Sequence, residues 1–244
     1  MTYIHRTDVH NTSAAKEVVP IVINMIQPKS VIDVGCGLGT WLAVFETFGV
    51  SDVLGVDGVY VDRSLLCIAD NKFLTTDLIN PLQLNRQYDL VVSLEVAEHL
   101  PESAADEFVQ TLTSLGDTIL FSAAIPGQDG QNHLNEQWPE YWREKFAKYR
   151  YVFNDVIRDK IWWNEKVEWW YRQNMFLVSK KVINEESQDK PLARIHPGLL
   201  KFKVEELNQL ERKLQQRIED FEKGEVGVQI GFNILKKAIQ RKIK

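Results

Sequence analysis

The stretch Ser30–Gly39, which reads S-V-I-D-V-G-C-G-L-G, decides the fold of this chain. Its first half contains Val31–Val34, a short run rich in β-branched residues that is typical of a buried parallel strand. Three glycines then alternate with other residues, and glycine both adopts positive φ and lets a ligand approach the backbone. The next residues, Thr40–Phe45, predict the first turns of a helix. A strand, a glycine turn and a helix in this order open a βαβ unit of the nucleotide-binding type.

The residues around Gly35, Gly37 and Gly39 indicate the kind of ligand. A dinucleotide fingerprint needs Gly or Ala where this chain has Thr40. Asp33 precedes the glycines, and its carboxylate suits an ammonium group better than a pyrophosphate. D-V-G-C-G-L-G resembles motif I of the class I S-adenosylmethionine-dependent methyltransferases, in which this loop lies against the methionyl part of the cofactor. A Rossmann-like domain with another ligand, or with none, is the alternative.

Two further acids follow predicted strands at positions that suit the same cofactor. Asp57 lies 22 residues after Gly35 and is followed by Gly58. An acid about 20 residues past the glycine turn bonds the ribose hydroxyls in this kind of fold, although a plain turn residue would also fit the position. The resemblance implies that Asp77 bonds the adenine amino group and that the backbone of Leu78 lies near the ring.

A second motif follows the predicted strand Tyr88–Ser93. Residues Ser93–Pro101 read S-L-E-V-A-E-H-L-P, which resembles the segment after the fourth strand in many small-molecule methyltransferases. Because ligands bind at the carboxyl ends of parallel strands, we expect Leu94 and Glu95 to line the cofactor. His99 is a candidate catalytic residue, and it could equally hold the loop through a hydrogen bond to the backbone.

These motifs lie in a chain whose strand and helix patterns alternate. A helix over Asn11–Ile26 precedes the first strand, and Pro20 either kinks it or marks its true start. Helix patterns then alternate with five strand patterns, the last of which is Thr118–Ser122. The predicted fold class is α/β, a Rossmann-like class I methyltransferase sandwich. The resemblance implies a mainly parallel seven-stranded sheet whose last strand, Met175–Ser179, is antiparallel.

The segment Ile125–Trp142 is rich in glycine, proline and hydrogen-bonding side chains, which indicates a binding loop. In the family that the chain resembles, the segment after strand five covers the acceptor. This polar loop suits a hydroxylated acceptor, and its pattern resembles uncharacterised methyltransferases associated with glycan biosynthesis. The candidate substrate-binding residues are Gln128, Asn132, Asn135, Glu136 and Trp138.

The predicted reaction is methyl transfer from S-adenosylmethionine to a hydroxyl of a polar, sugar-like acceptor. His133 lies in the acceptor loop and is the main candidate for general base, with Asn132, Asn135 or Glu136 orienting its ring. The alternatives are N-methylation of an amine or amino sugar, and a cofactor-binding accessory subunit without catalysis. A magnesium ion prefers carboxylates, and the loop offers only Asp129 and Glu136, so the site is expected to work without a metal.

Composition restricts the partners and the compartment. The 244 residues are 44% hydrophobic, which is enough for one sizeable core. The net charge of −5 comes from an acidic part over 1–193, with 17 Lys and Arg against 27 Asp and Glu, and a basic part over 194–244, with 12 against 7. An acidic catalytic domain disfavours nucleic acid as a partner. The lack of a signal-peptide pattern and of paired cysteines leads us to expect a cytoplasmic protein.

The predicted domain organisation has three parts. Residues 1–181 form the methyltransferase domain, 182–193 a polar linker and 194–244 an amphipathic helical extension. The helix predicted over Lys203–Glu222 could pair with itself in a homodimer. The basic segment Ile230–Lys244 could contact an anionic membrane or dock on its own protein.

Overall fold

The computed structural model describes residues 11–185, 191–223, 225 and 227–242. The chain forms two compact units, Met1–His196 and Pro197–Lys244. Part of the predicted linker, residues 186–190, lies outside the described residues.

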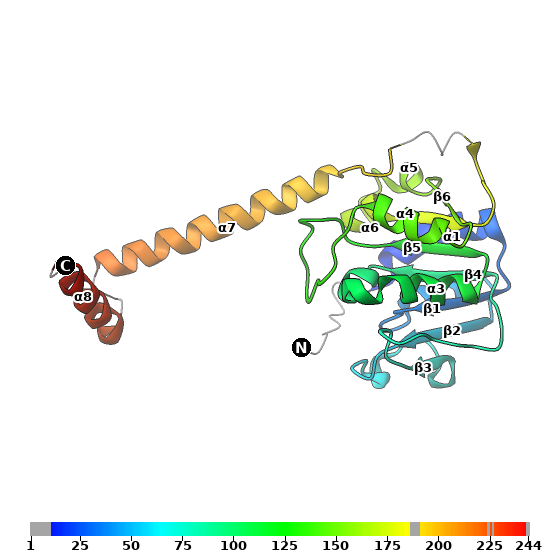
Figure 1. Ribbon diagram of the computed structural model, residues 1–244, viewed down its shortest axis with the longest axis horizontal. Coiled ribbons are helices and arrows are strands. Elements are labelled where there is room, and N and C mark those ends of the chain that lie inside the picture. The colour runs from blue at the N-terminus through cyan, green and yellow to red at the C-terminus, as the bar shows by residue number, and fades with distance from the viewer. Residues whose placement is uncertain (1–10, 186–190, 224, 226, 243–244) are drawn as a thin grey trace. The chain divides into compact units, whose positions relative to one another are not determined.

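The first unit is built on one seven-stranded sheet with the order β3-β2-β1-β4-β5-β7-β6 (Figure 1). The first five strands are parallel, whereas β7 runs antiparallel to both β5 and β6. This arrangement confirms the predicted fold class and its antiparallel last strand. The strands are β1 Ser30–Val34, β2 Asp52–Asp57, β3 Phe73–Thr75, β4 Leu90–Leu94, β5 Thr118–Ser122, β6 Val152–Asn154 and β7 Phe176–Ser179.

Helices cover both faces of the sheet and make two apolar cores. The core of one face includes residues of α1, α2 and α5, and that of the other includes residues of α3 and α4. The α-helices of this unit are α1 Ser13–Ile26, α2 Thr40–Thr47, α3 Ala105–Leu115, α4 Pro139–Ala147, α5 Arg158–Ile161 and α6 Trp169–Asn174. The 3₁₀ helices are η1 Arg63–Leu65, η2 Asp70–Lys72, η3 Ala97–His99 and η4 Glu102–Ala104.

The predicted regular alternation of strands and helices is only partly correct. Only the 3₁₀ helices η1 and η2 lie between β2 and β3, and residues 76–89 form no helix before β4. Pro81 explains part of this, because proline lacks a backbone donor and restricts the residue before it. Pro139 was expected in a loop but begins α4, since the first helical turn needs no backbone donor there. Pro20 lies inside α1, so it does not mark the start of that helix.

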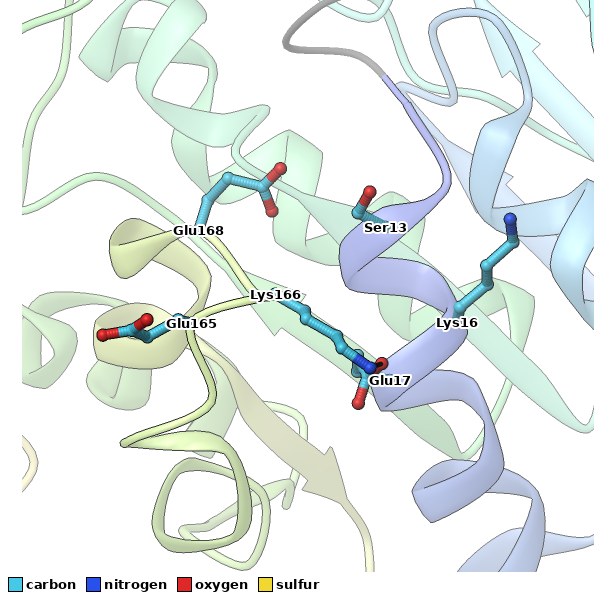
Figure 2. Close-up of a pocket in the computed structure, with 6 residues that line it drawn as sticks. All are labelled: Ser13, Lys16, Glu17, Glu165, Lys166 and Glu168. Atoms are coloured by element: carbon cyan, nitrogen blue, oxygen red, sulfur yellow. Dashed lines mark ion pairs between the residues drawn. The ribbon is translucent and has the colours of Figure 1, made fainter.

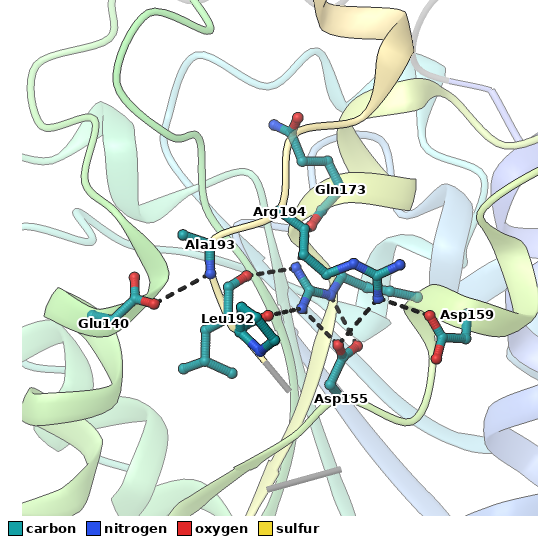
Figure 3. A network of polar contacts seen from close by, with 9 residues as sticks. Glu140, Asp155, Asp159, Gln173, Leu192, Ala193 and Arg194 are labelled. Carbon is teal, nitrogen blue, oxygen red and sulfur yellow. Dashed lines mark hydrogen bonds and ion pairs between the residues drawn. The ribbon is translucent and has the colours of Figure 1, made fainter. Parts of the chain in front are cut away.

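The first unit extends beyond the predicted boundary at residue 181 (Figure 3). The buried guanidinium of Arg158 pairs with Asp155 at 2.6 Å and also donates to the backbone carbonyls of Leu192, at 2.7 Å, and Pro191, at 3.3 Å. Leu192 also packs into the core of the first unit. Residues 191–196 therefore belong to the first unit, and the prediction of a linker to 193 with an extension from 194 is corrected here. The polar composition of the segment did not predict this packing, because the segment makes its contacts through backbone carbonyls and one apolar side chain.

The second unit consists of α7, Pro197–Glu222, and α8, Val228–Lys242. Helix α7 begins six residues earlier than the predicted start at Lys203. Its apolar residues at helical spacing, from Leu207 to Phe221, are about half exposed. Among the described helices, none combines the length and the apolar character needed to span a membrane.

Candidate functional site

The glycine turn after β1 requires glycine for both conformation and space. Gly35, Gly37 and Gly39 have φ angles of +87°, +54° and +73°, which side chains rarely adopt. A Cβ on Gly35 would lie 2.3 Å from Val96, because the end of β1 packs against the segment after β4. The amide of Gly35 donates to the carbonyl of Val56 at 2.7 Å, which ties the turn to β2.

Asp57, at the end of β2, holds this turn in place. Its Oδ2 accepts from the amide of Gly37 at 2.6 Å, and its Oδ1 accepts from the amide of Gly58 at 2.6 Å. A carboxylate has about four acceptor positions, so Asp57 keeps the capacity to bond ribose hydroxyls. Asp33 is buried nearby in β1; its burial, with the charge of Asp57 adding to it, raises the pKa of its carboxyl well above the ordinary value.

This set of groups fits S-adenosylmethionine. Buried carboxylates at Asp33 and Asp57 match an ammonium group and ribose hydroxyls, and a positive ligand offsets the cost of burying them. The turn Asp33–Thr40 contains no Lys or Arg that would bind a phosphate.

The predicted adenine contacts lie after β3. Asp77 is exposed, and its oxygens accept from the amide of Ile79 at 3.1 Å and from Nδ2 of Asn80 at 3.2 Å. Asp77 therefore stabilises its own turn in this structure. Leu78 packs against the core. The contact of Asp77 and Leu78 with adenine stays a prediction.

Glu95 follows the buried Leu94 and has an unusual backbone conformation. Its φ is +54°, in the left-handed region that costs a residue with a side chain, and such strain gathers at functional sites. Its amide donates to the carbonyl of Ser122 at 3.0 Å. Its carboxylate accepts from Nε2 of Gln128 at 2.7 Å and Nδ2 of Asn174 at 3.2 Å. Burial raises the pKa of Glu95, and these hydrogen bonds oppose that rise.

Glu98, His99 and His133 meet beyond the carboxyl end of β4. One potential ligand atom from each lies within 4.8 Å of the others, and the two imidazole rings stand edge to face with centroids 4.9 Å apart. Burial raises the pKa of Glu98 well above its ordinary value, and the neighbouring charge of Glu95 raises it further. Burial, with the charge of His133 adding to it, lowers the pKa of His99 to about 4.

Hydrogen bonds hold the predicted acceptor loop, in the segment Ile125–Trp142, so that His133 reaches this cluster. The amides of Leu134 and Asn135 donate to the carbonyl of Glu98 at 2.8 and 3.0 Å. Nδ1 of His133 lies 2.7 Å from Oε1 of Glu136, whose other carboxylate oxygen accepts from the amide of Gly127 at 2.7 Å. A loop fixed at both ends in this way presents the His133 ring in one orientation.

The predicted acceptor-binding residues divide into two groups. Gln128 and Asn135 are buried and bond within the protein, to Glu95 and to Gln137 respectively. Asn132 lies on the loop with a φ of +62°, and Trp138 is 41% exposed. The contact of these residues with an acceptor stays a prediction.

Sequence reasoning missed Glu98 and Asn174 as members of the site. Glu98 had a local signal, because it lies three residues after Glu95 and directly before His99. One turn of 3₁₀ helix, η3, begins at Ala97 and brings these groups together. Asn174 had no such signal, since its link to Glu95 depends on the fold alone.

A pocket of about 430 Å³, lined by Ser, Lys and Glu residues, lies between the start of α1 and the turn before α6 (Figure 2). Glu17 in its wall pairs with Lys166 at 3.2 Å and accepts from Nδ2 of Asn164 at 2.8 Å. Helix α6 begins directly after Glu168 in this wall and ends at Asn174, whose Nδ2 donates to Glu95. The lining residues, none of which was predicted, are Ser13, Lys16, Glu17, Glu165, Lys166 and Glu168.

Comparisons with solved structures show the same fold. An amino pentose methyltransferase from Micromonospora echinaspora, solved with S-adenosylmethionine bound, is 12% identical, with a TM-score of 0.50 over 70% of this chain and 91% of that chain. An S-adenosylmethionine-dependent methyltransferase from Clostridium acetobutylicum is 12% identical, with a TM-score of 0.50 over 69% and 92%. The small RNA methyltransferase HEN1 is 17% identical, with a TM-score of 0.50 over 72% of this chain and 26% of that chain. A search of curated protein sequences finds no match.

A model of the methyltransferase domain family matches residues 11–158, more than half of the 244 residues. The matched region contains the glycine turn, Asp57, Glu95 and the cluster of Glu98, His99 and His133. Its glycine turn and buried acids fit S-adenosylmethionine, which is the cofactor. The chain belongs to the methyltransferase domain family and is an S-adenosylmethionine-dependent methyltransferase.

Proposed function

We propose that this protein transfers a methyl group from S-adenosylmethionine to a hydroxyl of a polar, sugar-like acceptor. The observation that carries the proposal is the hydrogen bond between His133 and Glu136, 2.7 Å long, beside His99. A hydroxyl must lose its proton to attack the sulfonium methyl group, whereas a neutral amine attacks directly. An imidazole oriented by a carboxylate is the arrangement that such proton removal needs.

The acceptor loop supports a polar substrate. Asn132 and Trp138 lie on it with partly accessible side chains, an amide and an aromatic face that suit a hydroxylated ring. The same fold serves a sugar acceptor in the amino pentose methyltransferase from Micromonospora echinaspora. His133 either removes the proton of the acceptor hydroxyl or holds that hydroxyl in line with the methyl group. Positioning of this kind contributes about 7–11 kcal/mol to lowering the barrier.

A screen of acceptors with S-adenosylmethionine tests this proposal. Nucleotide sugars, glycan fragments and matched amino sugars are supplied in parallel, and the methylated product is identified by mass and fragmentation. His133→Ala is expected to lower turnover by about 10²–10⁴-fold while the affinity for the demethylated cofactor stays at the wild-type value. A fall of less than tenfold would remove His133 from the mechanism.

The alternatives give different products. Methylation on nitrogen of an amino sugar or another amine would replace the hydroxyl assignment. Tight cofactor binding without turnover on any acceptor would indicate an accessory subunit.

A further inference from the structure

The carboxylate of Glu98 is buried in a way that the protein alone does not explain. Its side chain is 0% exposed, and neither of its oxygens has a hydrogen-bond partner in normal geometry among the described residues. The backbone of Glu98 and Ala124 and the carboxylate of Glu95 are its polar neighbours, and Glu95 brings a second acid rather than a balancing cation. An ionised carboxylate is among the most expensive groups to bury without a partner. Buried groups of this kind in functional sites call for a water or an ion.

Two imidazoles stand beside this carboxylate. One potential ligand atom each from Glu98, His99 and His133 lies within 4.8 Å of the others. Ligand atoms bound to one ion at about 2.1 Å are roughly 3–4.2 Å from one another. A closing movement of under about 1 Å therefore brings all three atoms to bonding distance of a single ion.

The surroundings of the two rings are those of metal-binding histidines. Nδ1 of His133 is bonded to the carboxylate of Glu136, which leaves Nε2 for an ion. The His99 ring is hydrogen-bonded to the backbone of Gln131 and Asn132. Such outer contacts orient a ligating imidazole and set which nitrogen it offers.

The Glu95 carboxylate adds negative charge next to Glu98 and is itself held by Gln128 and Asn174. Two acids with two imidazoles make a site whose charge a divalent cation balances.

We propose that Glu98, His99 and His133 bind one divalent transition-metal ion at the carboxyl end of β4, with Glu95 beside it. Two nitrogen ligands favour manganese, iron, cobalt or zinc over magnesium. This proposal replaces the expectation of a metal-free site, which considered only the carboxylates of the acceptor loop, Asp129 and Glu136.

The ion gives the proposed function a specific chemistry, and this part rests on that proposed function. With three protein ligands, the ion keeps open positions that an acceptor hydroxyl oxygen can occupy. Coordination lowers the pKa of the hydroxyl, and its proton passes to solvent. The oxygen then forms a bond to the methyl carbon as the bond from that carbon to the sulfonium breaks, which yields the methyl ether and S-adenosylhomocysteine. Of the two roles proposed above for His133, this scheme selects the second: His133 binds the ion that holds the hydroxyl in line with the methyl group, and it does not remove the proton.

The test is direct metal binding to the full chain, without an acceptor. Protein stripped with EDTA is titrated with MnCl₂, and free Mn²⁺ is followed by electron paramagnetic resonance, with ZnCl₂ and MgCl₂ as competitors. We expect one Mn²⁺ per chain, displaced by Zn²⁺ more readily than by Mg²⁺. Glu98→Gln and His133→Ala should weaken binding by at least about 100-fold, and Glu136→Gln by about tenfold. The matched control Glu102→Gln, at an exposed acid nearby, should bind like wild type.

Binding of S-adenosylhomocysteine shows whether each variant is folded. If the Glu98→Gln variant is not folded, the metal affinity of His133→Ala decides whether the site exists. No binding at about millimolar Mn²⁺, or equal binding by wild type and both variants, would overturn the metal site. EDTA-treated enzyme that still methylates a hydroxyl at the full rate would remove the ion from the reaction and leave the proposed function standing. A protein that binds the ion but methylates an amine would overturn the proposed function and leave the metal site standing.

Discussion

At the scale of single residues, Asp57 holds the glycine turn, and we expect it to bond the ribose of the cofactor. Its two oxygens accept from the amides of Gly37 and Gly58, each at 2.6 Å. Asp57→Ala removes these bonds as well as the expected bonds to the ribose. We expect the affinity for S-adenosylhomocysteine to fall by about 10- to 150-fold, which corresponds to roughly 1.5–3 kcal/mol for a charge-assisted hydrogen bond. Isothermal titration calorimetry measures the change, with Glu107→Ala at an exposed acid as the control. Unchanged affinity would remove the ribose assignment.

His196 makes the stability of the first unit depend on pH. Its Nε2 lies 2.8 Å from the carbonyl of Trp162, and burial, with the charge of Arg172 adding to it, lowers the pKa of the ring. A histidine with a lowered folded pKa contributes its full stability above the unfolded pKa of about 6.5, and this contribution is lost as the pH falls through the folded value.

Replacement of this ring tests that dependence. His196→Gln keeps a donor for the Trp162 carbonyl but does not titrate. The difference in free energy of unfolding between wild type and variant should therefore shrink as the pH falls below about 6.5. Urea unfolding at several pH values measures it. A difference that stays constant across this range would show that folding does not lower the pKa of His196.

At the scale of elements, the acceptor loop depends on a close contact between Gly130 and His133. A Cβ on Gly130 would lie 2.2 Å from Nε2 of His133, so Gly130→Ala must push the ring away from the cluster. We expect turnover to fall by at least about tenfold, with cofactor affinity unchanged, because His133 loses the position that both proposals require. Gly231→Ala in α8, where a Cβ meets nothing within 4 Å, is the matched control. Equal turnover of the two variants would mean that the ring position does not matter.

The elements also show where sequence patterns were sufficient. The strands β1, β2, β4 and β5 could be predicted closely, because buried parallel strands are short apolar runs with clear boundaries. Strand β6 and helix α4 were harder to predict from the sequence. Strand β6 has only three residues, and the residues around Pro139 have the composition of a loop as well as of a helix start.

At the scale of the whole molecule, the first unit should fold without α7 and α8. A chain that ends at His196 keeps the contacts of Arg158 with Leu192 and Pro191. We expect it to unfold cooperatively and to bind S-adenosylhomocysteine like the full chain. A chain that ends at Lys190 loses the buried Leu192 and both carbonyls to which Arg158 donates, so it should be at least about 3 kcal/mol less stable. Urea unfolding and calorimetry of both chains measure this. Loss of cofactor binding by the longer one would contradict the boundary at His196.

Self-pairing through α7 and membrane contact through the basic end of α8 remain predictions. The half-exposed apolar residues of α7 lie at helical spacing, as pairing requires, and Lys236 and Lys237 lie on α8.

The sequence by itself determined the features that depend on residues close in the chain. The glycine turn needs positive φ at three positions, and only the local order of residues supplies it. The place of Asp57 follows from the strand pattern that it ends and from its spacing of 22 residues from Gly35. Tertiary structure alone decided the meeting of Glu98 with His133, which lie 35 residues apart, and the packing of 191–196 on Arg158. Both depend on burial and on hydrogen bonds to backbone carbonyls. Residue identity does not reveal which carbonyls are used, because every residue has one, and burial is decided by the fold.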